Sequence, residues 1–146
     1  MKEKMIVGWR ETLSLPGLGI EQINAKVDTG ARTSCLHAFK VESFTKEETL
    51  WVRFWIHPVQ RNTDKVTVCE AKVIDERIVR DSGGHEESRY VIQSDVSLGG
   101  QTWPIEITLT NRENMGFRML LGRTAMHRRI LVNPTKSFLI AFEESK

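Results

Sequence analysis

The feature that most constrains this chain is residues 25–34, where a carboxylate follows directly on an apolar run. Apolar and polar residues alternate before it, which predicts a strand with an apolar face formed by Ile23, Ala25 and Val27. The strand ends at Asp28, and the next residues, Thr29 and Gly30, favour a sharp turn. Acid–base catalysis needs a carboxylate on a rigid strand end, a hydroxyl that braces the loop and a glycine that admits a close neighbour. The segment therefore predicts a catalytic loop formed by Asp28, Thr29 and Gly30.

A second feature lies near the other end of the chain, at residues 119–126. An apolar run leads into Gly122, and a short helical pattern follows. Together the two features resemble the single-lobe, retropepsin-like aspartic peptidases. In that class apolar residues precede Asp-Thr-Gly-Ala, and the second element supports the catalytic loop from beneath.

The chain resembles one bacterial family more closely, the retropepsin-like family often labelled "ATP-dependent zinc protease". The blocks that carry this resemblance are VGWRE at residues 7–11, AKVDTGARTS at 25–34, LHA at 36–38, GG at 99–100, WPIE at 103–106 and FRMLLGR at 117–123. These blocks span almost the whole chain. The resemblance implies an all-β, retropepsin-like closed β-barrel with one short C-terminal helix.

The alternation of apolar and polar residues predicts the same fold class. Strands are expected at residues 6–15, 20–27, 33–39, 41–44, 50–57, 65–79, 89–98, 101–110 and 117–121. A helix is expected at 123–129, and a final hairpin from 130–132 and 137–142. In the strand at 101–110, Trp103, Ile105, Ile107 and Leu109 should point inward, and Pro104 indicates an edge position.

Length and composition limit the classes of protein to which the chain can belong. With 146 residues, 40% hydrophobic and 27% charged, the chain is expected to form one domain, residues 1–146, with its own core. No apolar run is long enough to cross a membrane, and no secretory signal is recognised, so we expect a cytoplasmic protein. The 21 basic and 19 acidic residues are too balanced to predict nucleic-acid binding. Two cysteines, Cys35 and Cys69, are too few for a disulfide scaffold and are expected to be buried.

The strand at 50–57 has two distinct faces. Its apolar face consists of Leu50, Val52, Phe54 and Ile56 and should belong to the core. Its other face carries Trp51, Arg53, Trp55 and His57. These side chains fit an interface or the wall of a groove, and they equally fit aromatics that pack under a loop.

Residues 81–88 form a glycine-centred polar tip between two β-rich arms. In retropepsin-like proteins a hairpin at this point of the chain folds over the substrate as a flap, so the resemblance implies that Gly83, Gly84 and His85 contact substrate. An ordinary surface hairpin is the alternative.

Peptide hydrolysis by carboxylates needs two of them close together, one as the base for water and one as the acid for the carbonyl. The chain has one Asp-Thr-Gly, so the simplest arrangement is a homodimer in which the two Asp28 side chains meet across a two-fold axis. The expected function is therefore that of an aspartic-type endopeptidase acting on a peptide or protein substrate.

Arg32 follows the motif where viral relatives carry an acidic residue. A cation here suits acidic substrates, and the alternative is a structural ion pair, for example with Glu106. The family is often associated with ATP-grasp glutamate ligases, which implies glutamate-rich tails as substrates and a functional link to such a ligase. Such substrates suit Lys26, and the expected substrate-binding residues at the loop are Ala31, Arg32 and Arg123.

The family label raises the question of zinc and ATP. His85-Glu86 is followed by Arg89 where a zincin would need its second histidine, and no phosphate-binding Gly-x-x-x-x-Gly-Lys-Ser/Thr loop occurs. Cys35 and His37 would need two more ligands from distant residues such as Cys69 or His57. We therefore expect no metal and no cofactor. The competing hypotheses are a non-catalytic peptide-binding or partner-binding module of the same fold and, with less support, a zinc-dependent protease.

Overall fold

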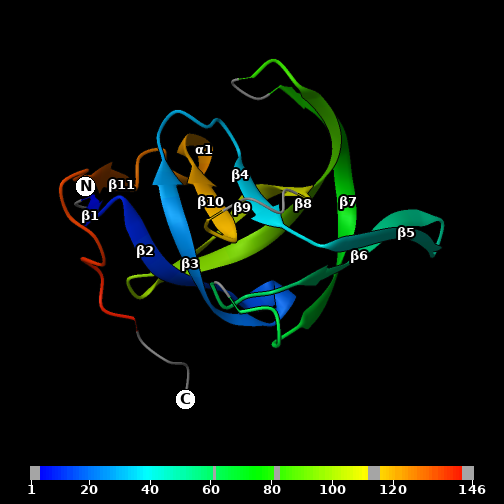
Figure 1. The fold of residues 1–146 in the computed structure, drawn as a ribbon, viewed down its shortest axis with the longest axis horizontal. Coiled ribbons are helices and arrows are strands. Elements are labelled where there is room, and N and C mark those ends of the chain that lie inside the picture. Colours follow the sequence, from blue (N-terminus) through cyan, green and yellow to red (C-terminus); the bar gives the residue numbers. More distant parts are fainter. Residues whose placement is uncertain (1–3, 61, 81–82, 112–115, 143–146) are drawn as a thin grey trace.

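The computed structural model describes residues 4–60, 62–80, 83–111 and 116–142, and its regular structure is almost entirely β (Figure 1). These residues form a nine-stranded sheet in the order β2-β3-β10-β4-β9-β8-β7-β6-β5 and a two-stranded sheet, β1-β11. The strands are β1 Met5–Val7, β2 Arg10–Leu15, β3 Ile20–Asp28, β4 Ser34–His37, β5 Lys40–Lys46, β6 Thr49–Ile56, β7 Thr67–Arg80, β8 Glu86–Leu98, β9 Gln101–Thr110, β10 Met119–Gly122 and β11 Ile130–Val132. The helices in the described part of the chain are the 3-10 turn η1, Pro16–Leu18, and α1, Arg123–Met126. The all-β class is confirmed.

None of the helices formed by these residues combines the length and the apolar character that crossing a membrane requires.

Alternate residues of the strands build the core. In β9 the predicted inward residues, Trp103, Ile105, Ile107 and Leu109, are all buried. Pro104 pairs with Asp95 of β8, whereas the pairing of β9 with β4 begins only at Ile107, so Pro104 does lie at a sheet edge. Proline has no backbone N–H, and at this position no hydrogen bond to a neighbouring strand is lost, because no described strand pairs with Pro104 on that side.

The prediction for the apolar face of β6 is right for three of its residues and wrong for the fourth. Val52, Phe54 and Ile56 are fully buried, whereas Leu50 is 43% exposed. Leu50 lies beside the turn at Glu47 and Glu48, at the end of the β5–β6 hairpin that projects from the sheet (Figure 1).

The aromatic face of β6 is half-buried and packs against cations of its own hairpin. The Lys46 ammonium lies 4.7 Å from the ring centroid of Trp51, and the Lys40 ammonium lies 4.6 Å from that of Trp55. One cation therefore lies over each of the two rings.

Strand β10 joins segments that are far apart in the sequence. It runs parallel to β3 on one side and antiparallel to β4 on the other, and thus lies between the strand that ends at Asp28 and the strand that follows the loop (Figure 1). The register places Gly122 directly beside Asp28.

The β7–β8 hairpin is the longest in the structure, and its curved end extends beyond the rest of the sheet (Figure 1). A register shift between Val73 and Asp75 explains the irregular alternation in this part of the sequence. The ion pair of Arg80 with Glu86 joins the two arms near the tip. Asp81 and Ser82 of the predicted tip lie outside the described residues.

Two predictions for the C-terminal region are wrong. The helix stops at Met126 rather than at residue 129, and Arg128 adopts a left-handed backbone conformation with φ of 63°, which a helix cannot continue. Residues 130–132 and 137–142 do not form a hairpin, because β11 pairs in parallel with β1.

The chain start and the C-terminal segment are packed backbone to backbone at Gly8. A Cβ atom at this residue would lie 2.4 Å from the carbonyl oxygen of Lys136, and the neighbouring Trp9 N–H donates to that same oxygen at 2.8 Å. The predicted strand at 6–15 is consequently divided into β1 and β2.

Glu11 secures this packing from inside the molecule. Its side chain is fully buried and accepts hydrogen bonds from the backbone N–H groups of Gly8 (2.7 Å), Leu139 (2.8 Å) and Ile140 (3.1 Å). A buried carboxylate with three N–H donors replaces the strand pairing that residues 137–142 do not make.

Replacing Glu11 with alanine should lower the free energy of unfolding by about 3–5 kcal/mol, because it leaves buried N–H groups without an acceptor. Urea denaturation followed by circular dichroism measures this loss. Glu21→Ala is the matched control, because Glu21 is exposed and its loss should cost less than about 0.5 kcal/mol. Equal losses in the two variants would contradict the assigned role of Glu11.

Candidate catalytic site

Asp28 is the last residue of β3, and its carboxylate is held by the loop that follows it. The Oδ1 atom accepts hydrogen bonds from the backbone N–H groups of Gly30 (2.9 Å) and Ala31 (3.2 Å). The side chain is half-buried, whereas Thr29 and Gly30 are exposed. The predicted turn thus forms around the carboxylate and fixes its orientation.

Gly122 supports this loop from the neighbouring strand. A Cβ atom here would lie 2.5 Å from the carbonyl carbon of Thr33 and 2.8 Å from the backbone nitrogen of Ser34. The Gly122 N–H donates to the Ser34 hydroxyl at 3.0 Å. Only glycine allows β10 to approach the loop this closely.

The start of helix α1 binds the loop carbonyl groups. The backbone N–H of Arg123 donates to the Ala31 oxygen at 2.8 Å, and that of Thr124 donates to the Arg32 oxygen at 3.0 Å. The Arg123 guanidinium adds a contact of 3.3 Å to the Gly30 oxygen. The first N–H groups of a helix have no partner within it, so these bonds satisfy both elements.

The fold therefore brings six of the residues singled out from the sequence into one place. They are Asp28, Thr29, Gly30, Ala31, Arg32 and Arg123. The other three, Gly83, Gly84 and His85, are exposed at the tip of the β7–β8 hairpin, which extends on the same side of the molecule as the loop after β3 (Figure 1). Their contact with substrate stays a prediction.

Glu106 is bound by a different arginine from the one considered in the sequence. The Arg77 guanidinium lies 2.9 Å from the Glu106 carboxylate and 2.7 Å from that of Asp75, whereas Arg32 is exposed. The hydrogen bonds from Arg77 and from the Glu76 N–H hold the pKa of the Asp75 carboxyl below its usual value, and its two carboxylate partners raise the pKa of Arg77. This network joins the hairpin to β9 and leaves Arg32 available to solvent.

The residues considered as metal ligands do not gather. Burial raises the pKa of the Cys69 thiol to about 12, and a metal needs the thiolate. Within the described ranges no three side chains of the histidine, cysteine, aspartate and glutamate types come together as a metal site would require.

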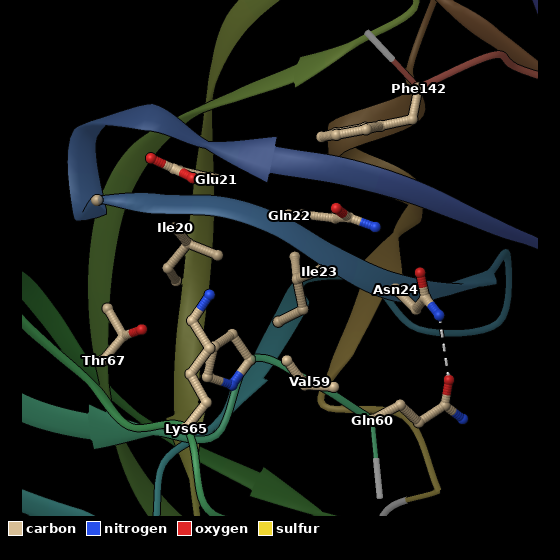
Figure 2. A pocket seen from close by; sticks show the side chains of 12 residues that line it. Ile20, Glu21, Gln22, Ile23, Asn24, Val59, Gln60, Lys65, Thr67 and Phe142 are labelled. Atoms are coloured by element: carbon tan, nitrogen blue, oxygen red, sulfur yellow. Dashed lines mark hydrogen bonds between the residues drawn. The ribbon is translucent and has the colours of Figure 1, made fainter. Parts of the chain in front are cut away.

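A cavity of about 550 Å³ lies at the opposite end of β3 from Asp28 (Figure 2). Ile20, Ile23 and Asn24 form one wall, and Val59 and Lys65 of the β6–β7 connection face them. The Asn24 amide donates to Gln60 Oε1 at 3.3 Å and closes one side (Figure 2). This cavity does not include Asp28, so it is separate from the candidate catalytic site.

Gly122→Ala should lower the free energy of unfolding by about 3 kcal/mol or more and disturb the loop, because the added methyl overlaps the backbone of Thr33 and Ser34. Thermal unfolding measures the loss. Gly116→Ala is the control, since its Cβ would meet no atom within 4 Å. A Gly122→Ala protein as stable as this control would show that the close approach is not required.

The chain is similar to known proteins in both sequence and structure. The model of the RimB-like family, described as the retropepsin-like aspartic endopeptidase RimB, matches residues 6–143. Proteins named probable alpha-L-glutamate ligase are 47% identical in Shewanella pealeana and 50% identical in Parasynechococcus marenigrum, each match covering 94% of this chain. The match covers only 30% and 29% of those relatives, so the chain spans less than a third of their length.

A solved structure supports the fold. A Legionella pneumophila protein of unknown function superposes with a TM-score of 0.78 at 25% identity, and the match covers 94% of this chain and 98% of that one. The resemblance inferred from the sequence blocks is confirmed by the family model, whose match extends over nearly the whole chain. The chain belongs to the RimB-like family of retropepsin-like aspartic endopeptidases.

Proposed function

We propose that the chain is an aspartic-type endopeptidase that hydrolyses peptide or glutamate-rich amide bonds as a homodimer. The observation that carries this proposal is the geometry of Asp28. Its Oδ1 atom is held by two loop N–H groups, and the loop is in turn held by Gly122 and helix α1. A carboxylate fixed in this way has the preorganised orientation that acid–base catalysis requires.

The proposed chemistry needs the Asp28 carboxylates of two copies. One takes a proton from water, which attacks the substrate carbonyl, and the other donates a proton to the carbonyl oxygen. Since the loop occupies Oδ1, we assign the contact with water to Oδ2. The two carboxylates titrate as a pair, so a pH profile of activity belongs to the dyad.

Basic residues around Asp28 support an acidic substrate. Lys26 lies two residues before it on the same face of β3, and Lys26, Arg32 and Arg123 are all exposed. The similar proteins named glutamate ligase suggest amide-linked glutamate as that substrate and a ligase as a functional partner. A peptidase with this preference would remove residues that such a ligase adds.

Three further parts of the proposal rest on the fold. The single pairing of Ser14 with Ser97 joins β2 to β8 and supports the closed barrel expected from the resemblance. The curved β7–β8 hairpin supports the assignment of its tip as a flap over the substrate. Cys35 and Cys69 are buried and are not joined in a disulfide, which suits a reducing compartment, and we propose the cytoplasm.

Asp28→Asn should reduce cleavage of a glutamate-rich peptide library by about a thousandfold or more, because it removes the base and keeps the side-chain shape. A chelator should leave the wild-type rate unchanged. Mass spectrometry of the products measures both effects. Cleavage that survives the substitution would refute the aspartic mechanism, cleavage lost to chelator would favour a zinc enzyme, and no cleavage by wild type would favour a binding module.

A mixing experiment tests the homodimer. Excess Asp28→Asn chain should inhibit the wild type, because mixed dimers carry one carboxylate, and the specific activity of the wild type should fall on dilution. Wild-type chain added in the same excess is the control and should not inhibit. Specific activity that is independent of both dilution and the Asp28→Asn chain would contradict a shared site.

A further inference from the structure

The sheet face that carries Asp28 extends across five strands to the β7–β8 hairpin. Core residues such as Val27, Leu36 and Ile107 point to the other face. On the face of Asp28, one residue from each of five adjacent strands forms a row in which each residue pairs with the next. From β3 through β10, β4 and β9 to β8, this row consists of Lys26, Leu120, Cys35, Thr108 and Val91. Lys26 and Asp28 share this face because they are two residues apart in one strand.

Arg89 lies on the same face of β8, two residues before Val91, and its side chain is only 8% exposed. Its Nε–H donates to Glu87 Oε2 at 2.9 Å. Its Nη1 atom lies 3.5 Å from Thr108 Oγ1 and 3.6 Å from Cys35 Sγ. The guanidinium is therefore buried over the row, against Glu87 of its own strand, Thr108 of β9 and Cys35 of β4.

A buried guanidinium needs a carboxylate partner, and Glu87 provides one from a side chain that is partly exposed to solvent. The Glu87 side chain is 42% exposed and also accepts a hydrogen bond from the Thr110 hydroxyl at 2.9 Å. Among the residues that the structure describes, Glu87 contacts Arg89 through Nε–H, whereas Nη1 donates to Cys35 Sγ and lies at the outer limit of hydrogen bonding from Thr108 Oγ1. No carboxylate of the described residues pairs with the two terminal nitrogens of the guanidinium, and such a pair of N–H groups is what binds a carboxylate through two parallel hydrogen bonds.

The position of Arg89 suits a substrate side chain near the cleaved bond. Cys35 lies two strands away from Lys26, and Asp28 lies two residues beyond Lys26 along β3. With a strand spacing of about 4.8 Å and a rise of about 3.3 Å per residue, the Cα atoms of Cys35 and Asp28 are roughly 12 Å apart. Extended peptide covers this distance in about three to four residues, and a glutamate side chain shortens the gap further. A peptide bound at Asp28 is therefore long enough to bring an acidic side chain to Arg89.

We propose that Arg89 is a specificity-determining residue that binds a glutamyl carboxylate of the substrate two to three positions from the cleaved bond, and that Glu87 occupies its place in the free protein. This inference rests on the proposed function. When substrate binds, its carboxylate replaces that of Glu87, which moves into solvent. The buried cation keeps one carboxylate partner in both states, so the exchange avoids the cost of an unpaired buried charge.

If this exchange occurs, Arg89 strengthens the binding of an acidic substrate, and Glu87 weakens it by competing for the same guanidinium. In the non-cleaving Asp28→Asn background, calorimetry compares a glutamate-rich peptide with the same peptide carrying glutamine. Arg89→Gln should lose the preference for the acidic peptide, about tenfold or more in Kd. Glu87→Gln should strengthen binding of the acidic peptide, because it removes the competing carboxylate and keeps an acceptor for Nε–H.

Arg80→Gln is the control, since Arg80 forms an exposed ion pair on the same hairpin, and it should leave the preference unchanged.

Circular dichroism and thermal unfolding establish that each variant is folded. An acidic peptide should raise the Tm of Glu87→Gln more than that of the Glu87 protein, a readout that a purely structural role would not give. A preference retained in Arg89→Gln, or equal weakening of both peptides by the Arg89 and Glu87 variants, would overturn the inference. These experiments measure binding without turnover, so their outcome is independent of the cleavage test with Asp28→Asn. That cleavage test alone decides the proposed function.

Discussion

The close approach of Gly122 to the backbone of Thr33 and Ser34 is the contact on which the arrangement at Asp28 depends. It allows β10 to lie between β3 and β4, and it places the Gly122 N–H against the Ser34 hydroxyl. The two N–H groups at the start of helix α1 then reach the loop carbonyl groups. The orientation of one carboxylate is consequently set by segments about ninety residues apart, through backbone contacts that have little freedom to adjust.

Glu11 and Arg89, which are the buried carboxylate and the buried guanidinium among the residues that the structure describes, are neutralised in different ways. Glu11 accepts from three backbone N–H groups, which cannot leave without unfolding the segment that carries them. Arg89 is paired with the half-exposed side chain of Glu87, which can rotate into solvent. A fixed partner makes the first charge a structural element, whereas a mobile partner suits the second to ligand exchange.

Much of the site could be predicted from the sequence, because its signals are local. Asp28, Thr29 and Gly30 lie in the turn that their residue types favour, and the inward face of β9 follows its alternation. Arg89 was missed because charged residues at alternate strand positions normally face solvent, whereas its guanidinium is buried against Glu87, Thr108 and Cys35. Glu87 was missed because only the folded structure shows it as the partner of Arg89. The C-terminal hairpin was predicted wrongly because the preference of residues 137–142 for strand structure is weaker than their bonds to Glu11.

The sequence by itself determined the strand-rich class, the catalytic-loop motif and the family, because periodicity, turn chemistry and motif spacing are written in neighbouring residues. The tertiary structure alone decided which strands are neighbours, which glycine lies against the loop and which arginine binds Glu106. These choices arise from contacts between segments far apart in the chain. Their free energies depend on the whole packed fold, and no local pattern encodes them.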